Sequence, residues 1–280
     1  MTSLSDTRLA STADGSDRWP GNFGRAMRAE WTKLRTAGGT GRLLLLAVAL
    51  TVAVGCGTAK AVKCPDTGCG QDAVKLALTG VTVGQAVVAV FAVLAVSGEY
   101  GTGMIRTTLT AVPNRITVLT AKATVLTAVL LASGTAAVLA SLLAGRFILP
   151  GNGFTAEHGY APLSLADGPT LRAAVGSVLY LVLIALLGLG VATAVREAAT
   201  AIGIVLGLLY LFPVVTQVVN NPEWQRHLQQ IAPMTAGLAV QATAGLQELP
   251  IGPWAGLGVL AAWAATALLA GGLLLRIRDA

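Results

Sequence analysis

The chain has 280 residues, of which 54% are hydrophobic and only 11% are charged. Soluble domains carry about a quarter charged residues, so this composition excludes an ordinary soluble globular protein. The formal net charge of +6 is explained by contact with an anionic membrane surface and does not require a nucleic-acid partner.

The apolar residues are grouped in six blocks with polar segments between them. Each block approaches or exceeds the roughly 20 residues that a helix needs to cross a bilayer, and the first block does so only with its flanks. The blocks cover residues 43–59, 76–96, 116–143, 171–195, 200–219 and 254–275. We therefore predict an all-α membrane protein, with six transmembrane helices in a domain over residues 42–280.

Lysine and arginine predict the orientation, because cytoplasmic loops retain these residues in excess. With the N-terminus inside, 13 of the 19 lysine and arginine residues lie on the cytoplasmic side. The bias toward Ala, Gly, Val and Leu is typical of a GC-rich bacterial genome. We expect a multi-pass protein of a bacterial plasma membrane, with both termini in the cytoplasm.

Two segments precede the first span. Residues 1–21 are rich in Ser, Thr, Asp and Gly and lack the apolar core of a signal peptide, which predicts a disordered cytoplasmic tail. Residues 22–41 are predicted to form an amphipathic helix at the membrane surface. Its apolar stripe consists of Phe23, Met27, Trp31 and Leu34. Glu30 lies at the edge of that stripe, and from the residues alone it forms a solvent-exposed pair with Lys33.

The first outer loop contains Cys64 and Cys69 around a turn rich in Pro and Gly. Two cysteines on the oxidising side of the membrane favour a disulfide. A metal site is the weaker alternative, because zinc usually needs four ligands and the histidines, His158 and His227, lie in other loops. We expect no metal and no cofactor.

Two glycine pairs, Gly80 with Gly84 and Gly203 with Gly207, lie one turn apart within the second and fifth spans. Small residues at this spacing let helix backbones approach closely. The pairs could serve the interior of the bundle or a dimer.

A polar segment, residues 97–115, separates the second and third spans and continues to Lys122. Thr102 could cap a short helix that ends before Pro113 and carries Ile105, Leu109 and Val112 on one face. From the residues alone, this segment is either an ordinary cytoplasmic loop whose basic residues set the topology, or a helix against the membrane or a partner.

The run Glu-Tyr-Gly-Thr-Gly-Met-Ile-Arg-Thr-Thr-Leu, followed by Pro-Asn-Arg and Lys122, resembles the segment between the second and third spans of type-2 ABC-transporter permeases. In that family the segment is a coupling helix that docks on a separate ATPase subunit. The resemblance implies an ATPase-coupling role for Glu99, Tyr100, Gly101, Thr102, Met104, Ile105, Arg106, Leu109 and Arg115.

Three further segments resemble parts of the same family. Residues 28–35 resemble its elbow helix, which lies beside the ATPase, and this implies a role there for Glu30, Trp31, Lys33 and Arg35. Arg196 and Glu197 resemble its second, smaller cytoplasmic contact. The amphipathic run before Pro233, with Trp224, Leu228 and Ile231, resembles its outer gate helix, for which a plain interfacial loop is the alternative.

Several kinds of chemistry are absent from the sequence. It contains no G-x-x-x-x-G-K-[ST], G-x-S-x-G or H-E-x-x-H motif, so we expect neither ATP hydrolysis by this chain nor an enzymatic activity. The middle of every predicted span lacks Asp, Glu, Lys, Arg and His, which argues against an ion-coupled carrier.

The expected function is that of the permease subunit of an ABC exporter, as a homodimer or a heterodimer, with ATP and magnesium bound by a cytoplasmic ATPase subunit. The alternative is a membrane scaffold or sensor that recruits a cytoplasmic partner without transporting anything.

Overall fold

The computed structural model describes residues 19–277 except 37, 66–68, 105–109 and 111–113, and residues 19–22 by their backbone alone. Within this part all regular structure is helical, with no strand. Six helical stretches are long and apolar enough to cross a membrane, which confirms the six predicted blocks. They are α2 (Gly38–Ala61), the pair α3 (Ala73–Leu78) and α4 (Val81–Gly101), α6 (Arg115–Ile148), α7 (Gly168–Val195), α8 (Ala198–Val218) and α11 (Pro253–Ile277).

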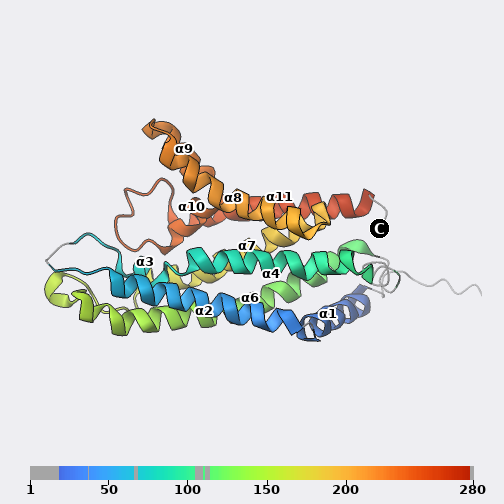
Figure 1. The fold of residues 1–280 in the computed structure, drawn as a ribbon, viewed down its shortest axis with the longest axis horizontal. Helices are drawn as coiled ribbons and strands as arrows, with labels where there is room; N and C mark the ends of the chain where they lie inside the picture. The colour runs from blue at the N-terminus through green and yellow to red at the C-terminus, as the bar shows by residue number, and fades with distance from the viewer. Residues whose placement is uncertain (1–18, 37, 66–68, 105–109, 111–113, 278–280) are drawn as a thin grey trace, which may run out of the picture.

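The helices form one elongated bundle (Figure 1). Helix α1 (Trp19–Thr36) and the end of α11 lie at one end, here called the α1 end. The opposite end carries α3 and the amphipathic helix α9 (Pro222–Ile231). Between α9 and α11 come two short helical segments, α10 (Pro233–Leu238) and η3 (Ala239–Gln241).

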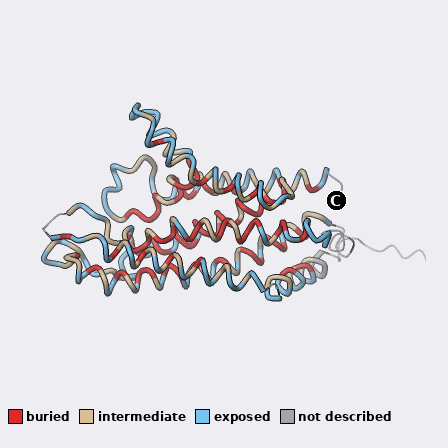
Figure 2. The backbone as a smooth tube through the Cα atoms, viewed as in Figure 1, coloured by how far each residue is buried: buried red, intermediate tan, exposed pale blue. Residues whose placement is uncertain are grey.

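Helix α7 is the centre of the bundle, where buried residues concentrate (Figure 2). Of its most apolar window, 61% is buried, against 17% in α8 and 22% in both α2 and α11. Tyr180 and Ile184 of α7 are fully buried. Because α2, α8 and α11 carry apolar side chains that the chain itself does not cover, their outer faces are suited to contact lipid or another membrane protein.

The second span is interrupted by a turn at Thr79 and Gly80, between α3 and α4. A Cβ atom on Gly80 would lie 1.7 Å from the carbonyl oxygen of Thr51 in α2, and one on Gly84 would lie 2.0 Å from the Thr51 hydroxyl. The Gly80–Gly84 pair is therefore a packing face inside the bundle. Gly203 and Gly207 have no atom within 4 Å of such a Cβ, so their face of α8 is open.

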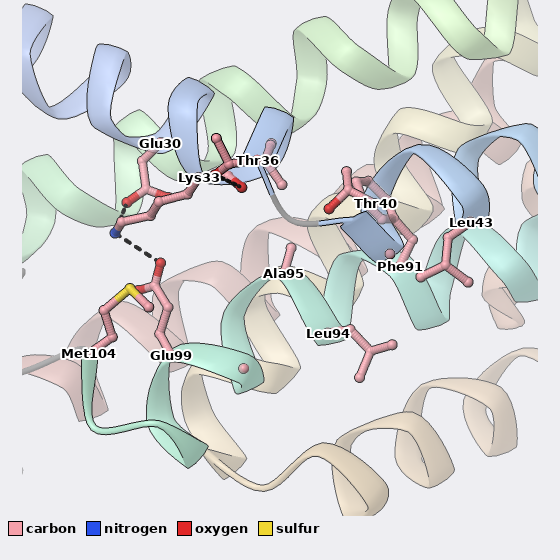
Figure 3. A pocket seen from close by; sticks show the side chains of 13 residues that line it. Glu30, Lys33, Thr36, Thr40, Leu43, Phe91, Leu94, Ala95, Glu99 and Met104 are labelled. Carbon is pink, nitrogen blue, oxygen red and sulfur yellow. Dashed lines mark hydrogen bonds and ion pairs between the residues drawn. The ribbon is translucent and has the colours of Figure 1, made fainter.

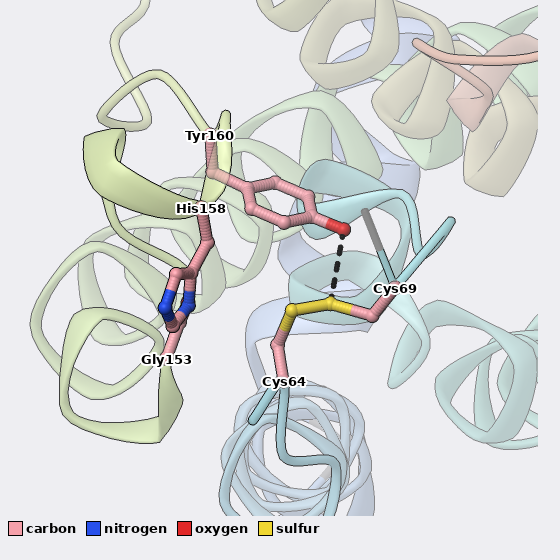
Figure 4. Close-up of a disulfide and its surroundings, with 5 residues drawn as sticks. All are labelled: Cys64, Cys69, Gly153, His158 and Tyr160. Carbon is pink, nitrogen blue, oxygen red and sulfur yellow. Dashed lines mark hydrogen bonds between the residues drawn. A yellow bond between two sulfur atoms is a disulfide. The ribbon is translucent and has the colours of Figure 1, made fainter. Parts of the chain in front are cut away.

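Two sets of contacts connect the loops at the opposite end of the bundle. Cys64 and Cys69 form the predicted disulfide, with Cα atoms 5.8 Å apart, and Tyr160 lies against it (Figure 4). Tyr160 comes from the loop after α6, whose short helical turns are η1 (Pro150–Asn152) and η2 (Ala156–His158). Separately, the Asp72 carboxylate caps α3 and accepts hydrogen bonds from Thr243 and Ala244. The first and last loops of this end are thus joined.

The observed helix bounds differ from the predicted ones. Helix α2 begins at Gly38, inside the segment 22–41 that was assigned to the amphipathic helix, and α6 extends from Arg115 to Ile148 rather than 116–143. Hydropathy marks only the apolar residues of a helix, whereas helical hydrogen bonding continues through the polar residues at its ends.

Candidate functional site

Four charged side chains meet at the α1 end, and we call them the ion cluster: Glu30, Lys33, Glu99 and Lys122. The Lys122 Nζ atom lies 2.6 Å from Glu30 Oε2 and 2.6 Å from Glu99 Oε1. The Lys33 Nζ atom lies 2.8 Å from Glu30 Oε1 and 3.0 Å from Glu99 Oε1 (Figure 3). Each lysine therefore joins α1 to α4, and Lys122 adds α6.

Local sequence places each member of the ion cluster. Glu99 lies in the last turn of α4, and Lys122 lies about two turns after α6 begins. The start of α6 is defined by Asn114, whose side chain accepts hydrogen bonds from the backbone N–H groups of the first turn. Glu30 and Lys33 are three residues apart on α1, so they lie on one face of that helix.

The ion cluster is largely removed from solvent. The exposed fractions are 4% for Glu30, 6% for Glu99 and 8% for Lys122. Burial of single charges carries a large desolvation cost, and pairing with opposite charges offsets it. Two carboxylates and two ammonium groups make the ion cluster neutral overall. Its ion pairs link the three helices α1, α4 and α6.

The pKa of Lys33 reflects this environment. Burial alone would lower the pKa of its ammonium group, but hydrogen bonds and attraction from Glu30, followed by those from Glu99, outweigh burial. The net effect is a pKa raised above the ordinary value of 10.5. Lys33 is therefore charged throughout the physiological range.

Glu30 forms the expected pair with Lys33 but is buried rather than exposed to solvent. It was expected either to pair with Lys33 in solvent or to face another protein. The pair with Lys33 is present, but Glu30 is buried within the chain and also contacts Lys122. The buried face of α1 includes Ala26 and Glu30, whereas Trp31, expected in the apolar stripe, is 51% exposed. Leu34 of the predicted stripe packs against the core, so helix α1 packs through one end of that stripe together with Ala26 and Glu30.

Thr102 lies at the end of α4. Its hydroxyl group donates a hydrogen bond to the Gly98 carbonyl, 2.8 Å away, and its backbone forms the C-cap of α4. A threonine hydroxyl in the last turn can satisfy a carbonyl that the helix leaves unpaired. The short helix that Thr102 was predicted to cap falls mostly on residues outside the described part of the chain. Gly103, with φ of 70°, then turns the chain.

Other residues of the predicted coupling segment are distributed around the ion cluster. The Arg115 guanidinium donates to the Leu275 carbonyl of α11, 2.6 Å away. Tyr100 lies under the guanidinium of Arg196, 5.5 Å from ring centroid to Cζ. Gly101 and Met104 are exposed. Ile105, Arg106 and Leu109, which were expected to form the coupling helix, lie outside the described residues.

Arg196 and Glu197 form the connection between α7 and α8. Arg196 ends α7 in a left-handed conformation with φ of 65°. Glu197 is the N-cap of α8, and its carboxylate accepts from the backbone N–H groups of Thr200 and Ala199. These hydrogen bonds, those from Thr200 foremost, lower the pKa of Glu197. The connection is therefore short and ordered.

The predicted gate residues lie at the opposite end of the bundle, on or next to α9. Trp224 is 64% exposed and Ile231 is 53% exposed, whereas Leu228 is partly covered. The indole N–H of Trp263 in α11 donates to the Ile231 carbonyl at 3.0 Å. Pro233 begins α10 and is buried. Helix α9 thus presents an apolar face that the described chain leaves largely open.

The pairs between helices in the ion cluster were not predicted, because residues 92 positions apart in sequence, such as Glu30 and Lys122, carry no local signal of contact. A polar cluster deep in the bundle was not predicted either. There Gln85 of α4 accepts from the hydroxyl of Tyr180 and donates to the hydroxyl of Tyr210, 3.3 Å away.

No protein-family model matches this chain, and no curated protein matches it either. Its interpretation therefore depends on the residues and their geometry. Within the described residues, no group of three or more His, Cys, Asp or Glu side chains could hold a metal ion. The described feature with most contacts between charged groups is the ion cluster, whose ion pairs connect α1, α4 and α6.

Proposed function

We propose that this chain is the membrane-spanning permease subunit of an ATP-driven exporter of the type-2 ABC class. In this proposal the α1 end faces the cytoplasm, and a separate ATPase subunit binds there. Nucleotide binding moves the ATPase, the segment between α4 and α6 transmits the movement, and the spans rearrange to release substrate outward. Differential contact with the two states of the ATPase supplies the energy for the change.

The observation that carries the proposal is the position of the ion cluster. It joins the last turn of α4 to the first turns of α6 through Glu99 and Lys122, the first and last residues of the run that resembles the family's coupling segment. Through Glu30 and Lys33 it also joins both spans to α1, which resembles the elbow helix. A force applied to the segment would therefore reach two spans and α1 together. In this proposal Glu99 is buried in the bundle and does not contact the ATPase. Its role is to hold the connection between α4 and α6 in position.

A second observation concerns the source of energy. The middle of each span has no Asp, Glu, Lys, Arg or His, and the buried charged residues of the described chain, Glu30, Glu99 and Lys122, lie at the α1 end. Ion-coupled carriers use ionisable groups at mid-depth to bind protons or ions. The location of the buried charges at the α1 end, where the ATPase subunit is proposed to bind, is consistent with energy supplied by ATP hydrolysis in that subunit.

Exporters of this class have two permease subunits, and α8 offers a surface for the second one. Gly203, Gly207, Leu211, Val214 and Val218 recur at helical spacing and are all exposed. Small residues at one end of such a face permit close approach of another helix. A cysteine at position 207, in a Cys56→Ser background, is expected to cross-link two copies in membranes, and the same change at Gly258 of α11 is the control.

Transport in inverted membrane vesicles tests the proposal. Glu99→Ala or Arg106→Glu is expected to abolish ATP-dependent transport while the protein still inserts in the membrane. Wild-type transport by both variants would contradict the coupling role. Transport without ATP would instead indicate a carrier. If affinity capture from membranes recovers a kinase or cell-wall enzyme and no ATPase, the alternative of a scaffold or sensor is favoured.

A further inference from the structure

A groove of about 450 Å³ lies on the surface of the bundle, where the last turns of α6 meet the loop that precedes α7. We call it the α6 groove. On the α6 side it is lined by Leu139, Leu142, Leu143 and Arg146, which recur at spacings of three and four residues and therefore share one face of the helix. Residues 163–166 and the first turn of α7 line the other side.

The lining of the α6 groove is mostly leucine. Leu142 is buried, whereas Leu139 is 37% exposed and Leu143 is 57% exposed. Leu165, from the loop on the other side, is 42% exposed. Exposed apolar side chains on a spanning helix face hydrocarbon, so the α6 groove is open sideways toward the lipid. A hydrocarbon chain lying in it would contact leucines from α6 and from the loop.

One end of the α6 groove is cationic. Arg146 lies in the last turn of α6, and Leu139 lies about 10 Å before it along the helix axis. Arg146 is therefore at the end of the span, at the depth of lipid headgroups, while Leu139 is within the hydrocarbon. Ser164 also lines the groove. Its hydroxyl oxygen accepts from the backbone N–H of Ala166, which leaves its O–H as a donor.

The charge of Arg146 is not balanced by an acidic side chain within the α6 groove. None of the lining residues is Asp or Glu, and Arg146 has no ion pair with another described residue. Asp167 follows the lining loop but caps α7, where its carboxylate accepts from the backbone N–H and the hydroxyl of Thr170. A guanidinium without a carboxylate partner is suited to bind a phosphate, whose oxygens match its fork of N–H donors.

We propose that the α6 groove binds a phospholipid of the membrane leaflet at this end of the bundle. One acyl chain lies along Leu139, Leu143 and Leu165, and the phosphate lies beside Arg146. The phosphate is the part of the headgroup that is recognised, because it accepts the hydrogen bonds that the guanidinium donates. The inference depends on the α6 groove and not on the exporter function.

Photo-crosslinking of the purified chain in detergent tests the proposal. The probes are a phosphatidylcholine with a diazirine in one acyl chain and the diacylglycerol with the same two chains. Neither probe has a net charge, so a general attraction to a basic protein cannot separate them. Charge-assisted hydrogen bonds to the phosphate are expected to make phosphatidylcholine label residues 139–143 and 163–166 about tenfold more than diacylglycerol does, as measured by peptide mass spectrometry.

Two pairs of matched variants test the location. Arg146→Gln is expected to remove the tenfold excess, whereas Arg226→Gln, at an exposed arginine of α9, is expected to keep it. Leu139→Trp fills the groove and is expected to reduce the labelling of residues 163–166. Leu131→Trp makes the same change on α6 outside the lining, at a residue that is 41% exposed, and is expected to leave it unchanged. Thermal unfolding verifies that all four variants are folded.

Three results would overturn the proposal. The first is equal labelling of the α6 groove by the two probes, or an excess that persists in Arg146→Gln. The second is labelling by neither probe, which would indicate that another protein chain covers the groove. The third is complete displacement of the phosphatidylcholine probe by inorganic phosphate, which would assign the site to free phosphate rather than to a lipid.

Discussion

Lys122 is the residue on which the arrangement of the α1 end depends most. Its ammonium group lies 2.6 Å from carboxylates of two different helices, and its side chain is 9% exposed. Removal of one partner from a buried ion pair leaves an uncompensated charge, at a cost of about 3–5 kcal/mol. We expect Lys122→Met to lower the free energy of unfolding in detergent by this amount, as measured by denaturant titration.

Two controls accompany this variant. Lys63→Met, at an exposed lysine, is expected to change stability by no more than about 0.5 kcal/mol. Adding Glu99→Gln to Lys122→Met removes one carboxylate, leaves Glu30 paired with Lys33, and is expected to recover part of the loss. Equal losses for the Lys122 and Lys63 variants would contradict the buried ion cluster.

Lys33 makes stability depend on alkaline pH. Its pKa in the folded protein lies above the unfolded value of 10.5, so the folded state binds the proton more tightly. The stabilisation is therefore complete below about pH 10.5 and is lost as the pH rises through the folded-state pKa. We expect the difference in melting temperature between wild type and Lys33→Met to shrink over that rise. A difference that is independent of pH would contradict the pairing.

At the scale of elements, the close contact between α2 and the start of α4 needs a glycine at position 80. Any side chain there meets the backbone of Thr51, which cannot move away without shifting α2. Gly80→Ala is expected to destabilise the protein by about 1–3 kcal/mol through overpacking. Gly203→Ala, at a position with open space, is the matched control and is expected to be neutral or stabilising in thermal unfolding. The reverse order would contradict the observed packing.

The disulfide between Cys64 and Cys69 stabilises the loop before α3. Cross-linking a loop this short reduces the entropy of the unfolded chain by an amount worth about 2 kcal/mol. The double variant Cys64→Ser, Cys69→Ser is therefore expected to unfold at a lower temperature than wild type under non-reducing conditions. Cys56→Ser, which alters the free cysteine of α2, serves as the control. If a reducing agent lowers the unfolding temperature of wild type and of the double variant by the same amount, the disulfide does not stabilise the protein.

Sequence patterns were sufficient for the elements and insufficient for their contacts. Hydropathy located all six spans because burial in a bilayer needs long apolar helices whatever their neighbours are. The amphipathic helix at residues 22–41 was predicted from its apolar stripe, but the face that packs on α6 contains Glu30. A buried carboxylate is stable there only because Lys122 is present, and periodicity within one helix cannot show a partner on another.

The Gly80–Gly84 and Gly203–Gly207 pairs make the same point. Both have the spacing of a close helix contact, yet only the first contacts another helix of this chain. Spacing identifies which residues allow close approach, whereas the packing of the whole bundle decides which of them are used. We predict that a second subunit packs on the open face of α8.

For the whole molecule, the main feature is an uneven distribution of charge. Apolar spans surround a central α7, and the buried charges gather at the α1 end beside the connection from α4 to α6. The spans have no Asp, Glu, Lys, Arg or His at mid-depth, and the proposal that a partner moves the bundle from the α1 end depends on this distribution. The sequence alone indicated the resemblance to a coupling helix in residues 99–115. The ion cluster that connects the two ends of this segment is visible only in the structure.

The most direct test is ATP hydrolysis by complexes captured from native membranes through this chain. We predict that wild type captures an ATPase subunit and supports hydrolysis, and that Arg106→Glu, expressed and inserted equally, loses both. Arg226→Glu, a matched change on α9 at the opposite end, is expected to retain both. Capture without any ATPase, or hydrolysis that Arg106→Glu leaves at the wild-type rate, would contradict coupling through the α1 end.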